Sequence, residues 1–393
     1  MFKTKKPNLL VISHAYNNFQ KDPIDIISNY SNNVSVLARS NPIAEISKYI
    51  SIPFLDRFKL DYRIDLTNKP SNLNVHPTPI LYGPTDTQYK KLGEKHVKAV
   101  EKAIIKNNIK FDLIHSHFSW SSGYAGAKLA EKHDVPFVVT AHGYDIYDLP
   151  FRDKEWKTKI EYVLNSADYI LTVSEKNSEL INELNVKTPV KVLPNGYRND
   201  LFHPKDAKEC RKILNLPIDK KIILTVGNLE VVKGHQYLID SMSEIIKHRQ
   251  DVMCIIVGDG KLMNKLKNQI NKAGLKNYVQ LTGARPHDEI PIWINACDAF
   301  VLPSLNEGNP TVMFETLGCG KPFIGTNVGG IPEIITSEDY GLLCKPTNSK
   351  ELAENILGSF DKDWDYEKIR EYGEQFTWNN TVNEILTVYS EIL

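Results

Sequence analysis

The sequence lacks the features that mark membrane-spanning, nucleic-acid-binding or disulfide-bonded proteins. No apolar run approaches the roughly 18 residues that a membrane-spanning helix needs. The 48 basic and 48 acidic residues give a formal net charge of 0, so no global charge attracts a nucleic acid. The five cysteines are scattered without a C-x-x-C pair, which favours reduced thiols. We therefore expect a cytoplasmic protein, soluble or peripheral at a membrane, with no nucleic-acid partner.

The glycine pattern of dinucleotide-binding proteins is missing as well. Residues 257–260 read VGDG at the end of an apolar run, but they do not form G-x-G-x-x-G. A structural turn and a ligand loop are equally open interpretations here. The basic start before Leu9–Ile12 hints at a signal peptide, but this apolar run is too short for one and predicts a first buried strand.

The length and the hydrophobic pattern predict two α/β domains. A chain of 393 residues exceeds one ordinary core. Short Val/Ile/Leu runs alternate with amphipathic stretches, which is typical of parallel strands buried on both faces and joined by helices. The expected strands are 8–13, 34–38, 111–117, 136–142, 169–174 and 190–196, followed by 220–227, 252–260, 278–283, 299–304 and 322–327.

The alternation stops near 197–215 and then restarts, so we predict an N-terminal domain over 1–200 and a C-terminal domain over 201–376. We also predict a last helix, 377–393, which could pack back onto the first domain. The other expected helices are 121–133, 154–166, 234–248, 261–273, 287–296 and 310–318. Ligands of parallel α/β sheets bind beyond the carboxyl ends of the strands, and two such domains facing each other would form a cleft.

The segment around Glu307 is the first candidate site. Glu307-Gly308-Asn309-Pro310 precedes a predicted helix, and Pro310 suits a first helical turn. The N–H groups of a helix start can hold an anion. Glu315 follows two turns later among apolar residues, where an idle charge would be costly. Because carboxylates accept hydrogen bonds from sugar hydroxyls, we favour a ligand site over a solvent-facing acid.

Two strand ends carry further candidates. Gly227 and Asn228 end one strand before Lys233, whose charge suits a pyrophosphate, although a solvated lysine is the commoner reading. His142 and Gly143 end another strand, where the imidazole could donate to a phosphate or a sugar; a hydrogen-bonded rim histidine is the alternative.

Three further patterns give only weak evidence for a binding site. His115 and His117 alternate like a metal pair, but no carboxylate cluster accompanies them. The run Asp361–Asp365 is interpreted as a solvated loop. A lysine stripe could touch an anionic membrane, but interleaved glutamates favour a solvated helix face; it comprises Lys91, Lys95, Lys98, Lys102 and Lys106. We therefore expect no metal site.

Taken together, the motifs resemble the retaining GT-B glycosyltransferases of family 4, the glycosyl transferases group 1 family. The resemblance covers nearly the whole chain, is strongest over 111–335, and rests on the order of the motifs rather than on any one of them. They are HSHFSW (115–120), TAHGYD (140–145), LPNGYRNDLFHP (193–204), VGNLEVVKG (226–234), VGDG (257–260) and PSLNEGNPTVMFETLGCGKPFIGTNVGGIPEII (303–335).

The resemblance implies a GT-B fold, two Rossmann-like domains facing across a central cleft, with the nucleotide-sugar donor bound by the C-terminal one. His142, Lys233 and Glu307 would be catalytic: near the transferred sugar, at the diphosphate and at the donor sugar, respectively. Glu315 would hold the ribose, and the base would lie near 283–285. The implied donor-binding set is Gly227, Asn228, Arg285, Gly308, Asn309, Pro310, Thr311 and Glu315.

The implied activity is transfer of a hexosyl group from a nucleotide-sugar to a glycan or glycolipid acceptor, with retention of configuration and without metal or other cofactor. A glycolipid or surface-polysaccharide acceptor would place the protein at the cytoplasmic face of a membrane. Two departures keep alternatives open: Asn228 stands where the family usually has arginine, and 14–23 has no glycine. The alternatives are a non-catalytic nucleotide-sugar-binding protein or another GT-B enzyme such as a sugar-nucleotide epimerase.

Overall fold

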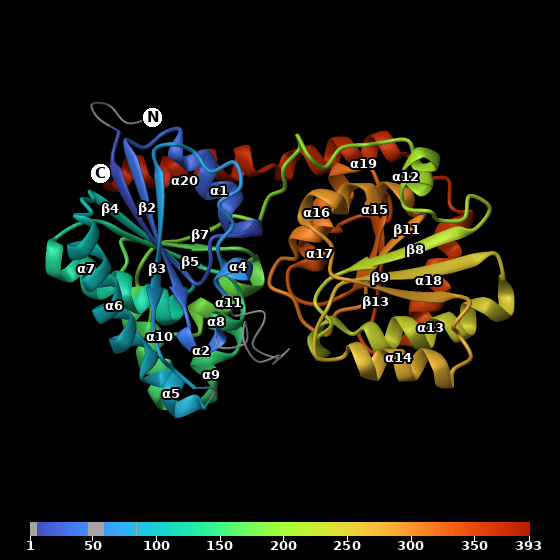
Figure 1. Cartoon of the computed structure of the whole chain (residues 1–393), viewed down its shortest axis with the longest axis horizontal. Coiled ribbons are helices and arrows are strands. Elements are labelled where there is room, and N and C mark those ends of the chain that lie inside the picture. The colour runs from blue at the N-terminus through green and yellow to red at the C-terminus, as the bar shows by residue number, and fades with distance from the viewer. Residues whose placement is uncertain (1–5, 46–58, 84) are drawn as a thin grey trace. The chain divides into compact units, whose positions relative to one another are not determined.

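The computed structural model describes residues 6–45, 59–83 and 85–393. The chain divides into two compact units (Figure 1). Unit 1 comprises Met1–Pro194 and Trp378–Leu393, and unit 2 comprises Asn195–Thr377. The junction therefore falls six residues before the one expected between 200 and 201, and the final helix is part of unit 1.

Unit 1 is built on a seven-stranded sheet with the order β3-β2-β1-β4-β5-β6-β7. Every strand pairing that the structure describes is parallel, which confirms the predicted α/β class. The strands are β1 (Asn8–Ser13), β2 (Asn33–Ser40), β3 (Leu73–Pro79), β4 (Leu113–His117), β5 (Phe137–Ala141), β6 (Tyr169–Thr172) and β7 (Val190–Val192).

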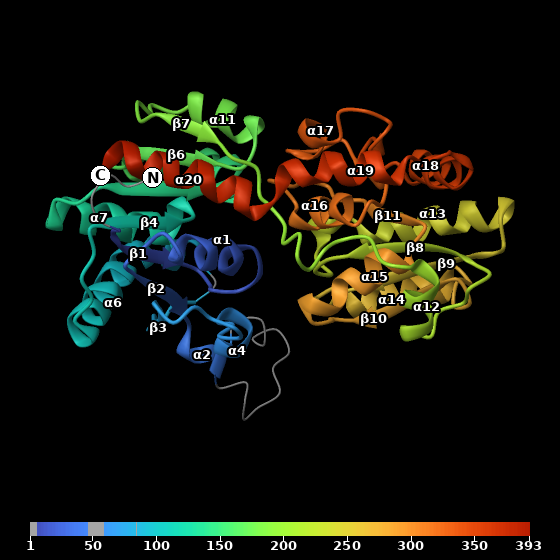
Figure 2. The ribbon, with the colours of Figure 1, turned by 90° about the horizontal axis from the view of Figure 1, so that it is seen from above.

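Helices cover both faces of this sheet (Figure 2). Leu9 and Val11 of β1 pack in a core with α1 and α20, whereas Leu10 and Ile12 pack in another with α6, α7 and α10. This alternation follows from the two-residue repeat of a strand. The helices are α1 (Asn18–Ser28), α2 (Pro42–Glu45), α4 (Leu60–Arg63), α5 (Asp86–Lys90), α6 (Leu92–Asn107), α7 (Tyr124–His133), α8 (Tyr144–Tyr147), α9 (Leu149–Arg152), α10 (Lys154–Asn165), α11 (Glu175–Asn182) and α20 (Trp378–Ile392).

Unit 2 repeats this plan with a six-stranded parallel sheet, in the order β10-β9-β8-β11-β12-β13. Its strands are β8 (Lys221–Val226), β9 (Val252–Val257), β10 (Val279–Gly283), β11 (Ala299–Leu302), β12 (Phe323–Thr326) and β13 (Gly341–Cys344). Its helices are α12 (Ala207–Ile213), α13 (His235–His248), α14 (Met263–Lys272), α15 (Ile290–Ala296), α16 (Thr311–Gly318), α17 (Ile331–Ile334), α18 (Ser349–Asp361) and α19 (Tyr366–Gly373).

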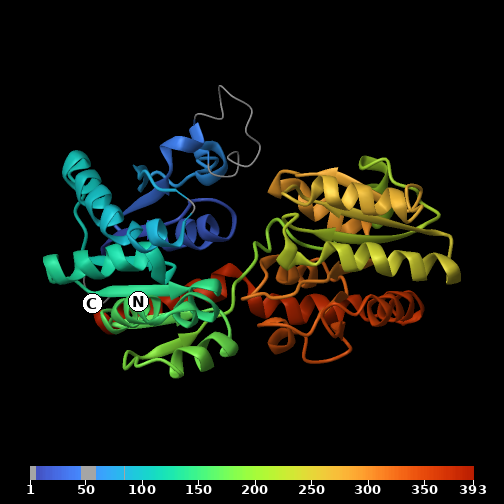
Figure 3. The same cartoon turned by 90° about the horizontal axis from the view of Figure 1, so that it is seen from below.

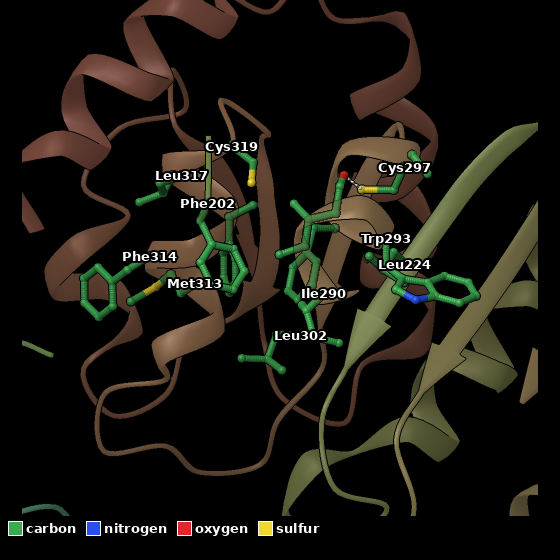
Figure 4. Packing of buried hydrophobic residues seen from close by; sticks show 14 of the residues in the cluster. Phe202, Leu224, Ile290, Trp293, Cys297, Leu302, Met313, Phe314, Leu317 and Cys319 are labelled. Atoms are coloured by element: carbon green, nitrogen blue, oxygen red, sulfur yellow. Dashed lines mark hydrogen bonds between the residues drawn. The ribbon is translucent and has the colours of Figure 1, made fainter. Parts of the chain in front are cut away.

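The two faces of the second sheet bury separate cores. Residues of α13, α14 and α18 share one core, and residues of α12, α15, α16 and α19 share the other. Figure 3 shows helices on both sides of this sheet. Figure 4 shows the second core, in which Phe202 lies near Met313 and Phe314 of α16. This apolar packing holds α16, the helix that carries Glu315, against the sheet.

Each strand predicted from the apolar runs is present in the structure, but two further strands were not predicted. β3 and β13 lie at the edges of their sheets. Pro77 and Pro79 interrupt the pattern of β3, and an edge strand tolerates proline because one side of it needs no ladder hydrogen bond. The glycine-free stretch 14–23 is only partly a loop, since α1 starts at Asn18.

A buried hydrogen bond joins the last helix to the first sheet. The Tyr389 hydroxyl of α20 lies 2.5 Å from Nδ1 of His115, and Nε2 of His115 lies 2.7 Å from the Thr140 hydroxyl. Both ring nitrogens of His115 are therefore engaged within the core. This histidine has a structural role, as β4 presents it to α20.

We expect Tyr389→Phe to lower the free energy of unfolding by about 1–3 kcal/mol, because it leaves a buried imidazole nitrogen without its partner. Thermal and urea unfolding of unit 1 would measure the change. Tyr62→Phe, at an exposed tyrosine of the same unit, is the matched control and should be neutral. Equal stability of the two variants would contradict the role assigned to the bond.

Candidate functional site

The order of strands in unit 2 reverses between β8 and β11, which are neighbours in the sheet. At such a switch point the loops that follow the two strands leave in opposite directions and open a crevice at the carboxyl edge. The loop after β8 carries Gly227, Asn228 and Lys233, and the loop after β11 carries Glu307 and Gly308. The sheet therefore brings together two motifs that are far apart in the sequence.

Lys233 and Glu307 form an ion pair across these loops. The Lys233 Nζ lies 2.6 Å from Oε1 of Glu307, and the Ser304 hydroxyl donates to the same oxygen at 2.6 Å. Glu307 is only 9% exposed, so its charge depends on these two donors. The pair leaves Lys233 partly exposed, so its ammonium is still accessible to an anion.

Two glycines allow the loops to approach closely. Gly234 has φ +64°, and a Cβ there would lie 1.9 Å from the carbonyl oxygen of Pro303. Gly329 has φ +53°, and a Cβ there would lie 1.7 Å from the carbonyl oxygen of Glu307. A side chain at either position would push these loops apart.

The segment from Gly308 to Thr311 leads into α16. Oδ1 and the carbonyl oxygen of Asn309 accept hydrogen bonds from the backbone N–H (2.8 Å) and side-chain amide (2.7 Å) of Asn195. Pro310 precedes the helix, which begins at Thr311. The start of α16 therefore follows the Glu307 loop directly in the chain, and the first N–H groups of a helix are able to bind an anion.

Glu315 is buried, at 4% exposure, on the second turn of α16. Its Oε1 lies 2.7 Å from Nε2 of His287. Sequence reasoning missed His287, because its motif HDE carries no strand-end or glycine signal. The His287 imidazole, which is 30% exposed, therefore lies between the buried carboxylate of Glu315 and solvent.

The remaining predicted donor residues lie at the rim. Asn228 is exposed, and its carbonyl oxygen accepts from the N–H of Glu230 at 2.8 Å. A Cβ at Gly227 would meet nothing nearer than the Lys233 Cδ at 4.0 Å, so space adjoins this backbone. Arg285 is exposed; its guanidinium lies 3.4 Å from the Thr282 carbonyl oxygen and over the Trp293 ring.

His142 belongs to unit 1, where it follows β5. Its Nε2 lies 3.0 Å from Nδ1 of His117, and its ring packs against Phe118. Burial, with His117 beside it, lowers the pKa of His142 well below its usual range. Asp145 holds the turn by accepting from the backbone N–H groups of His142 and Gly143. His142 is therefore a neutral hydrogen-bonding group at pH 7.

Within the described parts of the chain, no group of three or more His, Cys, Asp or Glu side chains has an arrangement that could hold a metal ion. The helices described there include none with both the length and the apolar character needed to cross a bilayer.

Comparison with known proteins places the chain in a family. The sequence profile described as "Glycosyl transferases group 1" matches residues 206–376, and that described as "Glycosyltransferase Family 4" matches 60–200. An uncharacterized glycosyltransferase of Methanocaldococcus jannaschii is 30% identical over 285 residues, 72% of this chain and 76% of the relative. The chain belongs to the glycosyl transferases group 1 family.

Two further similarities concern a curated relative and a solved structure. A Bacillus subtilis protein, whose name assigns it provisionally to teichuronic acid biosynthesis, is 34% identical over 261 residues, 66% of this chain and 64% of the relative. A crystal structure of an Anabaena protein in complex with UDP-glucose has a TM-score of 0.74 at 20% identity, covering 98% of this chain and 100% of the other. The latter similarity supports the GT-B fold, two Rossmann-like α/β domains.

The buried histidines predict a pH dependence of stability. Burial lowers the pKa of His96 to about 3 and the pKa values of His117 and His235 to about 4. In the unfolded chain an imidazole titrates near about 6.5. The stability from these neutral rings is therefore complete above pH 6.5 and is lost as the pH falls toward 4, by up to about 1.4 kcal/mol per pH unit for each.

His235→Gln should make the free energy of unfolding less dependent on pH, by the contribution of about one proton, or about 1.4 kcal/mol per pH unit. Urea unfolding between pH 4 and 7 would measure this slope. His248→Gln, at an exposed position in the same helix, is the control and should keep the slope. An unchanged slope in His235→Gln would show that its ring is already protonated in the fold.

Proposed function

We propose that this glycosyltransferase moves a hexosyl group from a nucleotide-sugar to a glycan or glycolipid acceptor, with retention of configuration and without a metal, at the cytoplasmic face of a membrane. The observation that carries the proposal is the Lys233–Glu307 pair, 2.6 Å apart at the switch point of the unit 2 sheet. The UDP-glucose in the Anabaena structure supports a nucleotide-sugar donor. The name of the Bacillus subtilis relative supports a surface-glycan acceptor.

The difficult step of such a transfer is departure of the nucleoside diphosphate, on which negative charge develops. Lys233 supplies a cation at this point, and the start of α16 supplies backbone N–H groups. Glu307 orients the lysine and offers its second oxygen to a sugar hydroxyl. No metal is needed in this scheme, since these groups neutralise the leaving group directly.

The other residues position the two ends of the donor. Glu315 accepts hydrogen bonds from the ribose hydroxyls, which replace its hydrogen bond with His287. The base lies near 283–285, in the loop that carries Arg285. We propose His142 of unit 1, whose buried imidazole is neutral, as a further catalytic residue. Asn228 has no charge to add to that of Lys233, so the contribution of Lys233 to leaving-group stabilisation is correspondingly large.

A donor panel tests the proposal directly. We expect one preferred donor among UDP-, GDP- and ADP-sugars, bound and slowly hydrolysed in the presence of a chelator, because the protein supplies all of the positive charge. Calorimetry and product chromatography would measure this. Abolition of hydrolysis by the chelator would contradict metal independence, and binding without turnover on any acceptor would favour a binding protein.

Two substitutions separate donor binding from chemistry. Lys233→Ala should lower kcat by about 10²–10³-fold, because it removes charge at the leaving group, and Lys233→Arg should retain more activity. Glu315→Ala should weaken donor binding by about 10–100-fold, with a smaller effect on kcat.

Exposed residues of the same unit provide the matched controls: Lys265→Ala in α14 and Glu354→Ala in α18 should behave like the wild type. Steady-state kinetics and calorimetry with the preferred donor would measure both effects. Wild-type constants in Lys233→Ala and Glu315→Ala would remove both residues from the site.

A further inference from the structure

His287 covers the carboxylate of Glu315 in unit 2. Its Nε2 donates to Oε1 of Glu315 at 2.7 Å. Glu315 as a whole is 4% exposed, whereas the side chain of His287 is 30% exposed. The imidazole therefore lies on the route from solvent to the carboxylate, and a ligand has to displace it in order to bind Oε1.

The hydrogen bond from His287 stabilises a carboxylate in an apolar setting. Met313, Phe314 and Leu317 of the same helix are fully buried in the core that surrounds Glu315. Within the described parts of the chain, no second side chain donates to the Glu315 carboxylate. A buried carboxylate without a donor is costly, so the contact with His287 contributes to the stability of unit 2.

The loop that carries His287 leaves room for the imidazole to turn away. Residues 284–286, directly before it, are exposed, and a Cβ at Gly283 would meet nothing within 4 Å. The ring of His287 packs against Phe202, with ring centres 5.2 Å apart. A histidine side chain rotates about two bonds, so the ring can leave Glu315 for solvent while the backbone stays in place.

We propose that His287 competes with the nucleotide for Glu315 and so limits the affinity of the site for the nucleoside diphosphate that the transfer releases. The inference rests on the proposed function, which assigns Glu315 to the ribose. A ribose has two adjacent hydroxyls and a carboxylate has two oxygens, so the exchange replaces one hydrogen bond by two. Binding is therefore favourable, but weaker than it would be without the competing imidazole.

This competition acts on the product as well as on the donor. The nucleoside diphosphate keeps the ribose of the donor, so Glu315 holds both in the same way. An apparent dissociation constant rises in proportion to the fraction of molecules in which the binding group is already engaged. The return of His287 to Glu315 therefore favours release of the nucleoside diphosphate after each transfer.

Calorimetry with UDP, GDP and ADP on the full chain tests the competition. His287→Ala should bind the preferred nucleotide about 3–10-fold more tightly than the wild type, because one hydrogen bond to a charged group no longer has to be broken. His248→Ala, at an exposed histidine of the same unit, is the matched control and should keep the wild-type affinity. Unchanged or weaker binding by His287→Ala would overturn the proposal.

A double-mutant cycle shows whether His287 acts through Glu315. In the Glu315→Ala background, His287→Ala should change the affinity no further, because the imidazole has no carboxylate to cover. His287→Gln keeps a side-chain N–H donor and should return the affinity toward that of the wild type. The same gain of affinity in both backgrounds would mean that His287 acts directly on the nucleotide, which contradicts the proposal.

Stability and histidine NMR give a readout that is independent of affinity. Without nucleotide, His287→Ala should have a lower thermal midpoint than the wild type, since the buried carboxylate loses its donor. The nucleotide should then raise the midpoint of the variant more than that of the wild type. In the wild type, the imidazole signal that is missing from His287→Ala should shift when the nucleotide binds, and a signal that stays in place would overturn the exchange.

These outcomes separate the role of His287 from the proposed function. Turnover of a donor, with equal nucleotide affinity in the wild type and His287→Ala, overturns the role of His287 only. Tighter nucleotide binding by His287→Ala, without turnover of any donor, overturns the transferase function only. If neither protein binds UDP, GDP or ADP, both are overturned.

Discussion

The position of each candidate site depends on one constraint, that parallel strands release their loops at the same edge of a sheet. In unit 2 the strand order reverses between β8 and β11, and this brings Lys233 to within 2.6 Å of Glu307. In unit 1 it reverses between β1 and β4, where His14 stacks on Phe118 with ring centres 4.5 Å apart. The same topology thus produces a charged pair in one unit and a basic, aromatic edge in the other.

The two edges differ in how their buried charges are balanced. Glu307 receives donors from Lys233 and Ser304, so the unit 2 site is internally compensated before any ligand arrives. Among the described residues, the buried Arg39 of β2 contacts a hydroxyl and an aromatic ring, which do not neutralise it. Compensation favours a preformed site, whereas a buried cation without a neighbouring carboxylate costs stability.

Much of the architecture could be predicted because buried parallel strands are continuous apolar runs. The edge strands β3 and β13 were not predicted, because an edge strand is less buried and its apolar run is less continuous. In β3 the edge position also tolerates Pro77 and Pro79. Among candidate site residues, Glu307, Lys233 and Glu315 could be named from glycines, strand ends and an apolar context. His287 could not, because its role follows only from its contact with Glu315, which is distant in the sequence.

The sequence by itself determined the α/β class, the two-domain plan and the family, because periodicity and ordered motifs are local or linear properties. Only the tertiary structure decided that α20 returns to unit 1, that His115 is a core residue held by Tyr389, and that Lys233 pairs with Glu307. These are long-range contacts, set by strand order and by which face of each element is buried. Burial also decides the charge state of His142, which the bare sequence leaves open.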